Sequence, residues 1–500
     1  MRYLIAIDQG TTSSRSLVYN ERFEVVGMGQ QSFPQHYPKP GWVEHDLWEI
    51  WHSVEASLKE AIKAATVADP GFDVQKIGAL GITNQRETFG LWDRSSGEPL
   101  ARAIVWQCRR SATICEKLKK SASGKKLPGI TGLVLDPYFS GTKLKWALDN
   151  NATWRRRAQK GEVAFGTMDT YLIWKLSAGR AHVTDISNAS RTLLMDLKKG
   201  EWSTTCLKTL GIPRSLLPKI LDSDAFFGET QGLSFLPDGI PIHGVLGDQQ
   251  AALFGQECFT PGEAKVTYGT GAFLLLNTGN KIRRTQSGLS TVAWRLRGKT
   301  TYALEGSVFI AGAAVQWLRD GINLVQKSGE IEGLARQVED TDGVFMIPAL
   351  TGLGSPYWVP QARGIIGGIT RGTKKAHIAR ACLEAIASSV AELFENLQKD
   401  SGLKLRRLRV DGGASQNSLL LRMQSDLTGV IVERPRDVES TARGAVYIAA
   451  LGAGFISNEK KLAGINPVDV ELRAQMSLKN RKEKMNLWKR RIKALLAGCY

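Results

Sequence analysis

Two acidic residues stand where an apolar run gives way to a polar turn, a position from which a carboxylate can do chemistry. Asp8 follows the run Tyr3–Ile7, and Asp248 follows a run that ends at Gly247. In phosphoryl transfer, one carboxylate would bind Mg²⁺ and another would accept the proton of an attacking hydroxyl. The alternative is that each acid only caps the turn after its strand, which is about as common. Residue type alone leaves both interpretations open.

Glycine and small hydroxyl residues fill two turns, each of which joins two apolar runs. The first turn, Gly10–Ser14, leads to Arg15, and the second is Gly269-Thr270-Gly271. Short side chains allow backbone N–H groups to converge on an anion, and Arg15 adds a fixed positive charge. One such turn is more often only a tight hairpin. Two of them in matching contexts favour a site for nucleotide phosphates.

A third apolar run, Ile77–Thr83, ends in the polar sequence Asn84-Gln85-Arg86-Glu87. An arginine next to a glutamate is most often part of a plain surface ion pair. Here the pair follows a strand and has neighbours that both donate and accept hydrogen bonds. That context favours a site for a polyhydroxylated substrate.

The common nucleotide-binding and hydrolase motifs are missing. Gly298-Lys299-Thr300 resembles the end of a P-loop, but Ala293 occupies a position that requires glycine. No Gly-x-Gly-x-x-Gly follows a strand, and neither a His-Glu-x-x-His nor a Gly-x-Ser-x-Gly motif occurs. Nucleotide binding would therefore use the two small-residue hairpins, as in the actin-like ATPase architecture.

The strand–turn–strand pattern occurs near the start of each half of the chain, which suggests an internal duplication. Apolar runs Tyr3–Ile7, Ser16–Tyr19 and Val25–Gly29 are expected to be strands, as are Ala264–Tyr268, Ala272–Leu276 and Leu408–Val410. Helical periodicity covers Leu47–Ala65, Ala311–Leu318, His377–Gln398 and Asn417–Leu427. We predict an α/β protein of two domains, residues 1–253 and 254–500, with the active site between them.

The composition limits the classes of function. The chain has 500 residues, of which 43% are hydrophobic and 23% charged, as in ordinary globular proteins of two large domains. Its formal net charge of +18 would suit nucleic acid or anionic small molecules. No zinc, RNA-binding or basic-zipper pattern accompanies the charge, so we expect no nucleic-acid partner. The basic stretch Lys479–Lys493 is expected to be a surface helix with a narrow apolar stripe.

Three features indicate a cytoplasmic protein without membrane insertion. The six cysteines are dispersed and form no Cys-x-x-Cys pair, which suits a reducing compartment. Asp8 interrupts the apolar core that a signal peptide needs. The longest uncharged stretch, Gly343–Ala362, contains three prolines and would not span a bilayer as a helix.

The motifs together resemble the FGGY carbohydrate kinase family of the actin/hexokinase-like superfamily, over nearly the whole chain. The most specific motifs are DQGTTSSR at 8–15, PKPGWVEHD at 38–46, GITNQRET at 81–88, IVWQCRR at 104–110 and GDQQAALFGQ at 247–256. Two of them, GITNQRET and GDQQAALFGQ, resemble the motifs that distinguish the members acting on glycerol from their pentulose relatives. The segments YFSGTKLKWALDN at 138–150 and GSPYWVPQARGIIGGITRGT at 354–373 are similar to the family's two signatures, although Ala147 replaces a bulkier aliphatic residue.

The resemblance implies two ribonuclease H-like domains, each a mixed five-stranded sheet flanked by helices, with the active site in the cleft between them. It implies ATP- and Mg²⁺-dependent phosphorylation of glycerol to sn-glycerol 3-phosphate. Asp248 would be the general base, Asp8 and Asp248 would bind the metal, and Arg15 would assist catalysis. Glycerol would be held by Arg86, Glu87, Trp106, Tyr138, Asp248, Gln249 and Phe273. ATP would be held by Thr11, Thr12, Ser13, Arg15, Gly269, Thr270, Gly312, Gln316, Gly413 and Asn417.

Two alternatives remain open on the sequence: a kinase of the same fold that acts on a pentulose or another polyol, and a non-catalytic, DNA-binding member. The second would be expected to lack Asp8, Asp248 or the hairpin glycines, and all are present. Some family members are controlled by fructose 1,6-bisphosphate or by phosphorylation of a loop histidine. The corresponding segment, Glu229–Pro241, contains neither arginine nor histidine, so we expect neither control. A homo-oligomer is expected.

Overall fold

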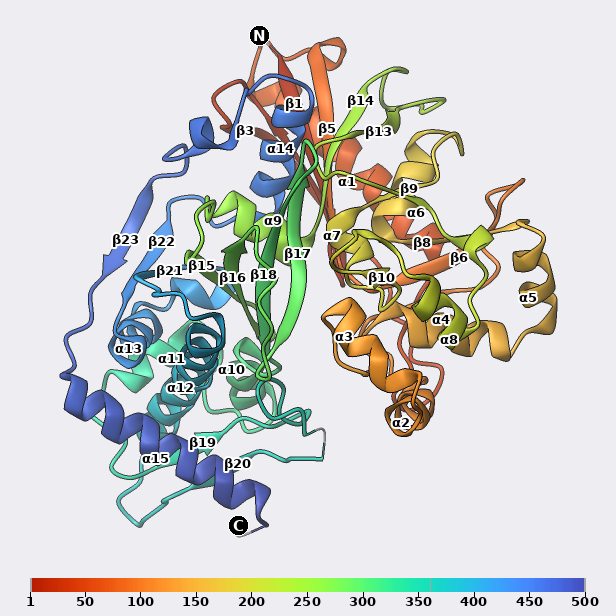
Figure 1. Cartoon of the computed structure of the whole chain (residues 1–500). Coiled ribbons are helices and arrows are strands. Elements are labelled where there is room, and N and C mark those ends of the chain that lie inside the picture. Colours follow the sequence, from red (N-terminus) through yellow and green to blue (C-terminus); the bar gives the residue numbers. More distant parts are fainter. Residues whose placement is uncertain (1, 360, 499–500) are drawn as a thin grey trace.

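The computed structural model describes residues 2–359 and 361–498, so Pro360 of the second signature and Cys499 lie outside the described residues. Two large mixed sheets form the two halves of the molecule (Figure 1). The first half contains the N-terminus and lies at the top in this view, and the second ends in the long C-terminal helix α15 (Leu478–Leu496). Among the described residues, no helix combines the length and apolar character that a membrane span requires.

The first sheet has six strands in the order β13-β14-β5-β1-β2-β3. β1 pairs antiparallel with β2 and parallel with β5, which in turn pairs parallel with β14. The apolar runs of β1 and β5 are buried almost throughout, as expected for central strands with both faces covered. The strands are β1 (Tyr3–Gln9), β2 (Ser13–Tyr19), β3 (Val25–Ser32), β5 (Ile77–Asn84), β13 (Phe226–Glu229) and β14 (Pro241–Gly247).

The second sheet has seven strands in the order β17-β18-β16-β15-β21-β22-β23. β15 pairs antiparallel with β16 and parallel with β21, and β21 pairs parallel with β22. The strands are β15 (Ala264–Tyr268), β16 (Ala272–Gly279), β17 (Leu289–Leu296), β18 (Lys299–Val308), β21 (Arg407–Asp411), β22 (Ile431–Pro435) and β23 (Val468–Leu472).

The two sheets share one five-stranded unit, which confirms both the predicted sheet type and the internal duplication. In the first half the unit is β3-β2-β1-β5-β14, and in the second it is β18-β16-β15-β21-β22. Each unit has two antiparallel pairings on one side of its first strand and two parallel pairings on the other. The remaining strands, β13, β17 and β23, extend the edges of these units.

Helix α1 (Leu47–Ala68) covers one face of the first sheet. Asp46 caps its N-terminus, since the side chain accepts hydrogen bonds from the backbone N–H groups of Trp48 and Glu49. Its buried residues recur at helical spacing and pack in one core with strands of the first sheet. The predicted helix Leu47–Ala65 is therefore confirmed, three residues longer at its end.

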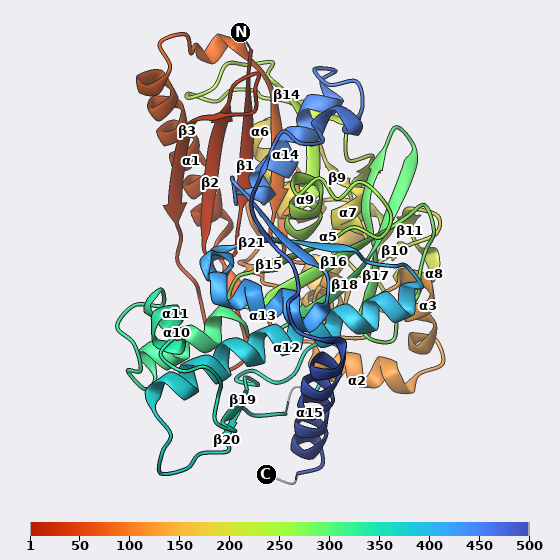
Figure 2. The same ribbon diagram turned by 90° about the vertical axis from the view of Figure 1, so that its left-hand side faces the viewer.

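Helices α9 (Asp248–Gly255) and α14 (Ser440–Gly452) lie between the two sheets (Figure 2). Although α14 belongs to the second half of the sequence, it packs against β1, β5 and β14 of the first sheet. One apolar core joins α9 and α14 to side chains from both sheets, among them Leu4 and Leu275. The predicted boundary between the two domains, after Leu253, falls inside α9. This division of the chain stays a proposal.

The second half has its own helical layer. The predicted helices there are confirmed with ends shifted by a few residues, as α10 (Gly312–Asp320), α12 (Lys375–Ser401) and α13 (Ser418–Thr428). α15 presents a buried stripe of Met485, Trp488 and Ile492, and its other positions are largely exposed or intermediate, as the basic stretch predicted. The remaining elements are α11 (Glu330–Ala335), β19 (Phe345–Ile347) and β20 (Ile365–Gly367).

An insertion between β5 and β13, joined by β4 from the segment before α1, builds a side lobe at the right of Figure 1 around a four-stranded sheet in the order β4-β7-β6-β8. That sheet comprises β4 (Glu44–His45), β6 (Phe89–Asp93), β7 (Ala103–Ile104) and β8 (Val163–Thr167). The lobe's helices are α2 (Ala112–Lys120), α3 (Leu127–Thr131), α4 (Ser140–Asp149), α5 (Ala152–Gln159), α6 (Met168–Leu176), α7 (Ile186–Ala189) and α8 (Thr204–Leu210). Its short strands are β9 (Val183–Asp185), β10 (Met195–Asp196), β11 (Glu201–Trp202) and β12 (Lys219–Leu221).

The contact between α9 and α14 predicts that Gly444→Ala destabilises the fold. A Cβ at Gly444 would lie 1.9 Å from the carbonyl oxygen of Ala251, so the helices would have to separate. Overpacking of this kind costs about 1–3 kcal/mol. We expect a lower midpoint of thermal unfolding, measured by calorimetry. The matched control is Gly333→Ala in α11, where a Cβ meets nothing within 4 Å and should be neutral or slightly stabilising. Equal midpoints for the two variants would contradict this view of the helix contact.

Candidate active site

Three parallel strands of the first sheet bring the predicted catalytic residues to one edge. In the register of β1, β5 and β14, Asp8 lies opposite Thr83, and Gly247 lies opposite Asn84. Asp248 follows Gly247 directly and begins α9. Because the carboxyl ends of parallel strands meet at the same edge, Asp8, the segment after Asn84, and Asp248 converge there.

The backbone at Glu87 is held in an unfavourable conformation. Its φ is +61°, in the left-handed region that residues other than glycine seldom adopt. Two contacts hold the turn: Ser140 Oγ donates to the carbonyl oxygen of Glu87 at 2.8 Å, and Thr88 N donates to that of Arg86 at 2.7 Å. Strain of this kind collects at functional sites, where it fixes a side chain that relaxed geometry would misplace.

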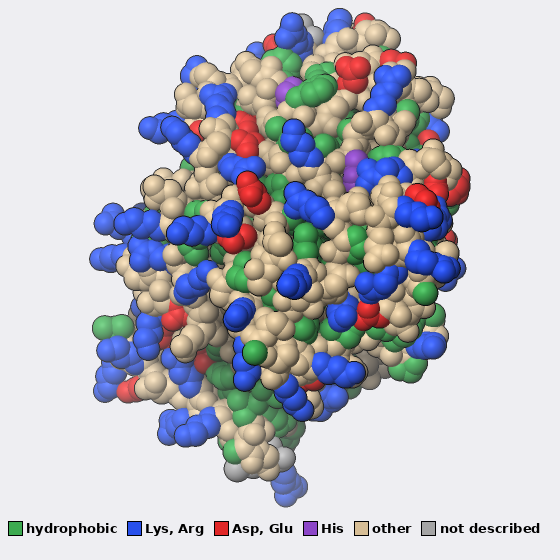
Figure 3. Space-filling model, turned by 45° about the vertical axis from the view of Figure 1, so that its right-hand side comes forward, with side chains coloured by type: hydrophobic (Ala, Val, Ile, Leu, Met, Phe, Trp, Pro, Cys, Tyr) green, Lys and Arg blue, Asp and Glu red, His purple; other side chains and the backbone are tan. Residues whose placement is uncertain are grey.

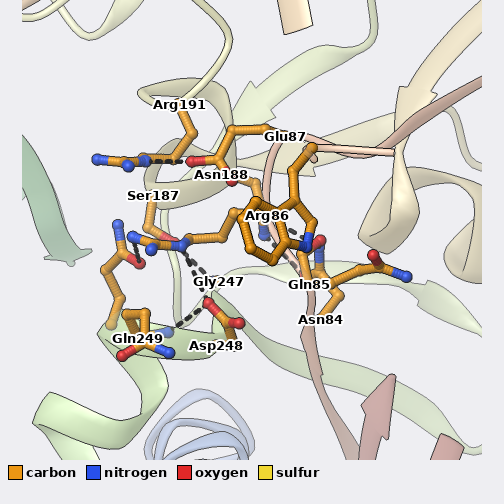
Figure 4. A network of polar contacts seen from close by, with 12 residues as sticks. Asn84, Gln85, Arg86, Glu87, Ser187, Asn188, Arg191, Gly247, Asp248 and Gln249 are labelled. Carbon is orange, nitrogen blue, oxygen red and sulfur yellow. Dashed lines mark hydrogen bonds and ion pairs between the residues drawn. The ribbon is translucent and has the colours of Figure 1, made fainter. Parts of the chain in front are cut away.

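The Arg86 guanidinium is the centre of a buried ion-pair network (Figure 4). Its Nε lies 2.9 Å from Asp248 Oδ1. Its Nη1 and Nη2 donate to Glu305 Oε2 and Oε1 at 2.5 and 3.0 Å, and Nη1 also donates to Gln250 at 3.2 Å. Hydrogen bonds take three of the five N–H groups of an arginine, and Nε faces Asp248 in an ion pair, which leaves one N–H on Nη2 for a ligand.

Glu87 belongs to the same network through a second arginine. Arg191 donates from Nε to Glu87 Oε1 at 2.7 Å and from Nη2 to Glu305 Oε1 at 3.0 Å. Burial raises the pKa of Glu87, and Arg191 and Arg86 oppose this effect. Burial also acts to raise the pKa of Glu305, but there the opposing effect of the same two arginines is larger. The pKa of Glu305 is therefore below its usual range. Glu87 Oε2 takes no contact from the described chain and is available to a hydroxyl.

The plain surface ion pair considered for Arg86 and Glu87 is therefore wrong, because both side chains are buried and each has its partners elsewhere. The sequence reading missed Arg191 and Glu305. Arg191 follows a short helix in a polar stretch and carries no local signal. Glu305 did carry one, since it is an acid inside an otherwise apolar run of β18.

Asp248 presents one oxygen to the protein and the other to the site. Oδ1 accepts from the backbone N–H of Gln249 at 2.6 Å and pairs with Arg86, whereas Oδ2 takes no hydrogen bond from the described residues. The Gln249 side chain is held by a buried lysine of the second sheet, whose Nζ donates to Gln249 Oε1 at 2.5 Å and to Thr267 Oγ1 at 2.7 Å. Burial lowers the pKa of this residue, Lys265, to about 8. Lys265 was another residue that the sequence reading missed.

Aromatic side chains form a wall beside the network. Trp106 and Tyr138 meet edge to face, with ring centroids 5.6 Å apart. Trp106 Nε1 also donates to Thr11 Oγ1 at 3.1 Å, which ties this wall to the first hairpin. Phe273 lies opposite Ser307 in the register of β16 and β18, two residues along from the pairing of Leu275 with Glu305. Phe273 and Glu305 therefore stand on the same face of the second sheet.

The first hairpin has the closed turn that the glycine and hydroxyl residues predicted. Gly10 N donates to Ser13 O at 2.9 Å, and Asp8 pairs with Arg15 across the two strands. Thr12 is exposed, and Thr11 and Ser13 are half-buried. The Arg15 side chain forms an ion pair with Glu439, the residue before α14.

Three segments of the second half meet at the other hairpin. The backbone N–H groups of Gly312 and Ala313, at the start of α10, donate to the carbonyl oxygens of Gly269 and Thr270 at 3.0 Å each. The Gly412–Gly413 turn contacts the base of the hairpin, where a Cβ at Gly412 would lie 2.5 Å from Tyr268 O. Of the other predicted ATP residues, Asn417 caps α13 by accepting from Leu420 N, and Gln316 is exposed on α10.

The surroundings of Asp8 suit a cation. Burial is the main cause that raises the pKa of its carboxyl to about 7; Arg15 opposes this effect, and Asp248 and Glu439 add to it. Among the described residues, no group of three or more His, Cys, Asp or Glu side chains could hold a metal ion. Two carboxylates with space for phosphate oxygens and water are a usual arrangement for Mg²⁺, which seldom has an all-protein site.

A cavity of about 660 Å³ opens between the halves next to the aromatic wall. Arg109, Asp136 and Pro137 line it from the first half, and Trp358 and Gln361 from the second. Asp136 accepts a hydrogen bond from Tyr138 N at 2.8 Å, so the cavity adjoins the predicted substrate residues. The described residues that line the cavity include none of the predicted substrate or nucleotide residues, so it lies beside the predicted site.

Comparison with known proteins gives the same picture over the whole chain. The FGGY family of carbohydrate kinases matches by its N-terminal domain at residues 3–255 and by its C-terminal domain at residues 264–453. A protein of Bdellovibrio bacteriovorus named glycerol kinase is 51% identical over 97% of this chain and 98% of its own length. Another so named, from Alkalilimnicola ehrlichii, is 55% identical over 91% of each chain.

The solved structure of Plasmodium falciparum glycerol kinase with ADP is also similar. It superposes with a TM-score of 0.91 at 34% identity, covering 99% of this chain and 98% of that one. A xylulose kinase from Lactobacillus acidophilus, at 22% identity and a TM-score of 0.86, shares the fold. Since the two domains of the family match residues 3–255 and 264–453, the chain belongs to the FGGY family of carbohydrate kinases.

Proposed function

We propose that the chain phosphorylates glycerol with ATP to give sn-glycerol 3-phosphate and ADP. The observation that carries the proposal is the cluster of free polar groups at the end of β5 and the start of α9. These are one N–H of Arg86, Oε2 of Glu87 and Oδ2 of Asp248, on side chains that the protein already holds in place. The near-full-length identity of about half to proteins named glycerol kinase supports it.

This set of groups suits a small polyol. Arg86 donates and Glu87 accepts, so vicinal hydroxyls can each find a partner that is itself rigid. Gln249 and Tyr138 add further polar contacts, and Trp106 and Phe273 would cover the carbon edge. A hydrogen-bonding site with buried polar groups rejects analogues that leave those groups unpaired.

Asp248 is proposed as the general base of the transfer. As a terminal hydroxyl of glycerol attacks, its proton passes to Asp248 Oδ2, and its oxygen bonds to the γ-phosphorus of ATP. The bond between that phosphorus and the bridging oxygen breaks, and ADP leaves. Arg86, bound to Oδ1, keeps the carboxylate oriented while Oδ2 receives the proton.

The nucleotide is proposed to lie between the two hairpins. Thr11, Thr12, Ser13 and Arg15 would meet the phosphates from the first half. Gly269, Thr270, Gly312, Gln316, Gly413 and Asn417 would meet the nucleotide from the second, where their segments already converge. Asp8 and Asp248 would hold Mg²⁺, which when bound neutralises charge on the β- and γ-phosphates.

We further propose a cytoplasmic, homo-oligomeric enzyme with small-molecule partners. The five cysteines among the described residues are buried and free, which suits a reducing compartment. Lys and Arg side chains are spread over the face in Figure 3 and do not gather into one stripe, which favours small substrates over nucleic acid. Light scattering that returns the monomer mass would contradict the oligomer.

The test of the function is a coupled assay of ADP release with glycerol, xylulose or ribulose as the acceptor. We expect the highest kcat/KM with glycerol and no release without an acceptor. A higher kcat/KM with a pentulose would assign the chain to another branch of the family.

Replacing Arg86 with alanine should raise the KM for glycerol at least tenfold, because it removes a donor, leaves Glu305 with Arg191 alone and removes the arginine that pairs with Asp248. The KM for ATP should change much less. The matched control is Arg443→Ala, which removes a similarly buried arginine paired with Asp437. If the KM for ATP of the Arg86 variant rose as much as its KM for glycerol, Arg86 would act in the nucleotide site or in holding the fold together.

Asp248→Asn keeps the size of the side chain but cannot accept the proton. We expect kcat at saturating glycerol to fall by about two to four orders of magnitude. The measurement is kcat across a Mg²⁺ titration. A variant within about tenfold of wild type, or one rescued by excess Mg²⁺, would remove Asp248 from the role of base.

Glu439→Gln should lower the KM for ATP by up to about fivefold, the range expected from a partly exposed ion pair. Arg15 would no longer have to leave Glu439 to meet a phosphate, and a negative charge near that phosphate would be gone. Steady-state kinetics with ATP as the varied substrate would check this. An increased KM would show that Glu439 holds Arg15 in its binding position.

A further inference from the structure

Glu305 is an acid in the interior of a strand where its neighbours are buried. It lies on β18, beside Leu304 and opposite Leu275 of β16. Its side chain is fully buried, and it reaches out of the second sheet to two arginines of the first half, Arg86 and Arg191. Burying a carboxylate destabilises the fold unless its partners compensate, so an apolar residue at this position of the strand would be more favourable. Strand stability therefore does not explain why a glutamate occupies position 305.

The geometry of the contact supplies that reason. Glu305 accepts hydrogen bonds from both Nη atoms of Arg86. The Nε side of the guanidinium therefore faces Asp248. The same carboxylate takes Nη2 of Arg191, and the Nε of that arginine holds Glu87. Glu305 is thus the partner common to both arginines. Through them it fixes two carboxylates, Glu87 and Asp248, that it does not itself touch in any recorded contact.

We propose that Glu305 is a positioning residue for glycerol recognition, supplied by the second half of the chain to residues of the first. The inference rests on the proposed function, since it takes Arg86, Glu87 and Asp248 as the glycerol site. It makes that site dependent on both halves, because the groups that meet glycerol are aligned only when β18 lies against the end of β5. A bidentate contact to a planar guanidinium fixes orientation as well as distance, which a single hydrogen bond would not.

Glu305→Gln tests the proposal, because it keeps size and some hydrogen bonding but removes the charge that orients two guanidiniums. We expect the KM for glycerol to rise at least tenfold, with the KM for ATP within about threefold of wild type. The matched control is Glu433→Gln. Glu433 is a buried glutamate of the same sheet that also pairs with two arginines, Arg407 and Arg409. Glu433→Gln should lower the unfolding temperature about as much as Glu305→Gln does, and it should leave the KM for glycerol unchanged.

A second variant, Glu305→Asp, keeps the charge but shortens the side chain, so the bidentate contact cannot form in place. It should raise the KM for glycerol even where Glu305→Gln fails to fold. Either variant, folded and with a glycerol KM within twofold of wild type, would overturn the proposal, as would an equal rise in the KM for ATP. Wild-type protein without glycerol-dependent turnover would instead refute the proposed function, so the two failures are distinguishable.

Discussion

The site depends on a buried set of opposite charges shared by the two halves of the chain. Arg86 and Arg191 face Glu87, Glu305 and Asp248, and four of the five side chains are almost completely buried. Removing one partner of such a set leaves a buried charge uncompensated, at a cost of about 3–5 kcal/mol. Each of these charged residues is therefore compatible with the fold only when its partners are present. The same contacts hold the side chains in fixed positions, so a ligand meets rigid polar groups.

Duplication of one five-stranded unit gives each half a hairpin of small residues but not the same chemistry. The first hairpin stands between Asp8 and Arg15 and is bordered by the strand ends that carry the polyol site. The second has glycines at the start of α10 and in the Gly412–Gly413 turn, and these let three backbone segments pack closely: a Cβ would lie 2.6 Å from Gly269 O at Gly312 and 2.5 Å from Tyr268 O at Gly412. One copy of the unit thus supplies charged side chains, and the other supplies closely packed backbone.

Much of this was predictable because it is local in sequence. The hairpins, the polar ends of apolar strands and the helical periodicity of α1, α12 and α13 each lie within a short window. Arg86, Glu87 and Asp248 could be chosen from their positions after strands. The partners could not, because Glu305 lies 219 residues from Arg86, and no local pattern records such a pairing. The packing of α14 on the first sheet was equally invisible, since helix periodicity does not say which sheet a helix covers.

The position of α14 has a consequence for how the protein is made. The first sheet is complete once β14 has been synthesised at residue 247, but one of its faces is covered by residues 440–452. A nascent chain would expose that apolar face while the ribosome adds nearly two hundred further residues, at roughly 5–20 per second. The core of the first sheet is therefore complete only when residues 440–452 are in place.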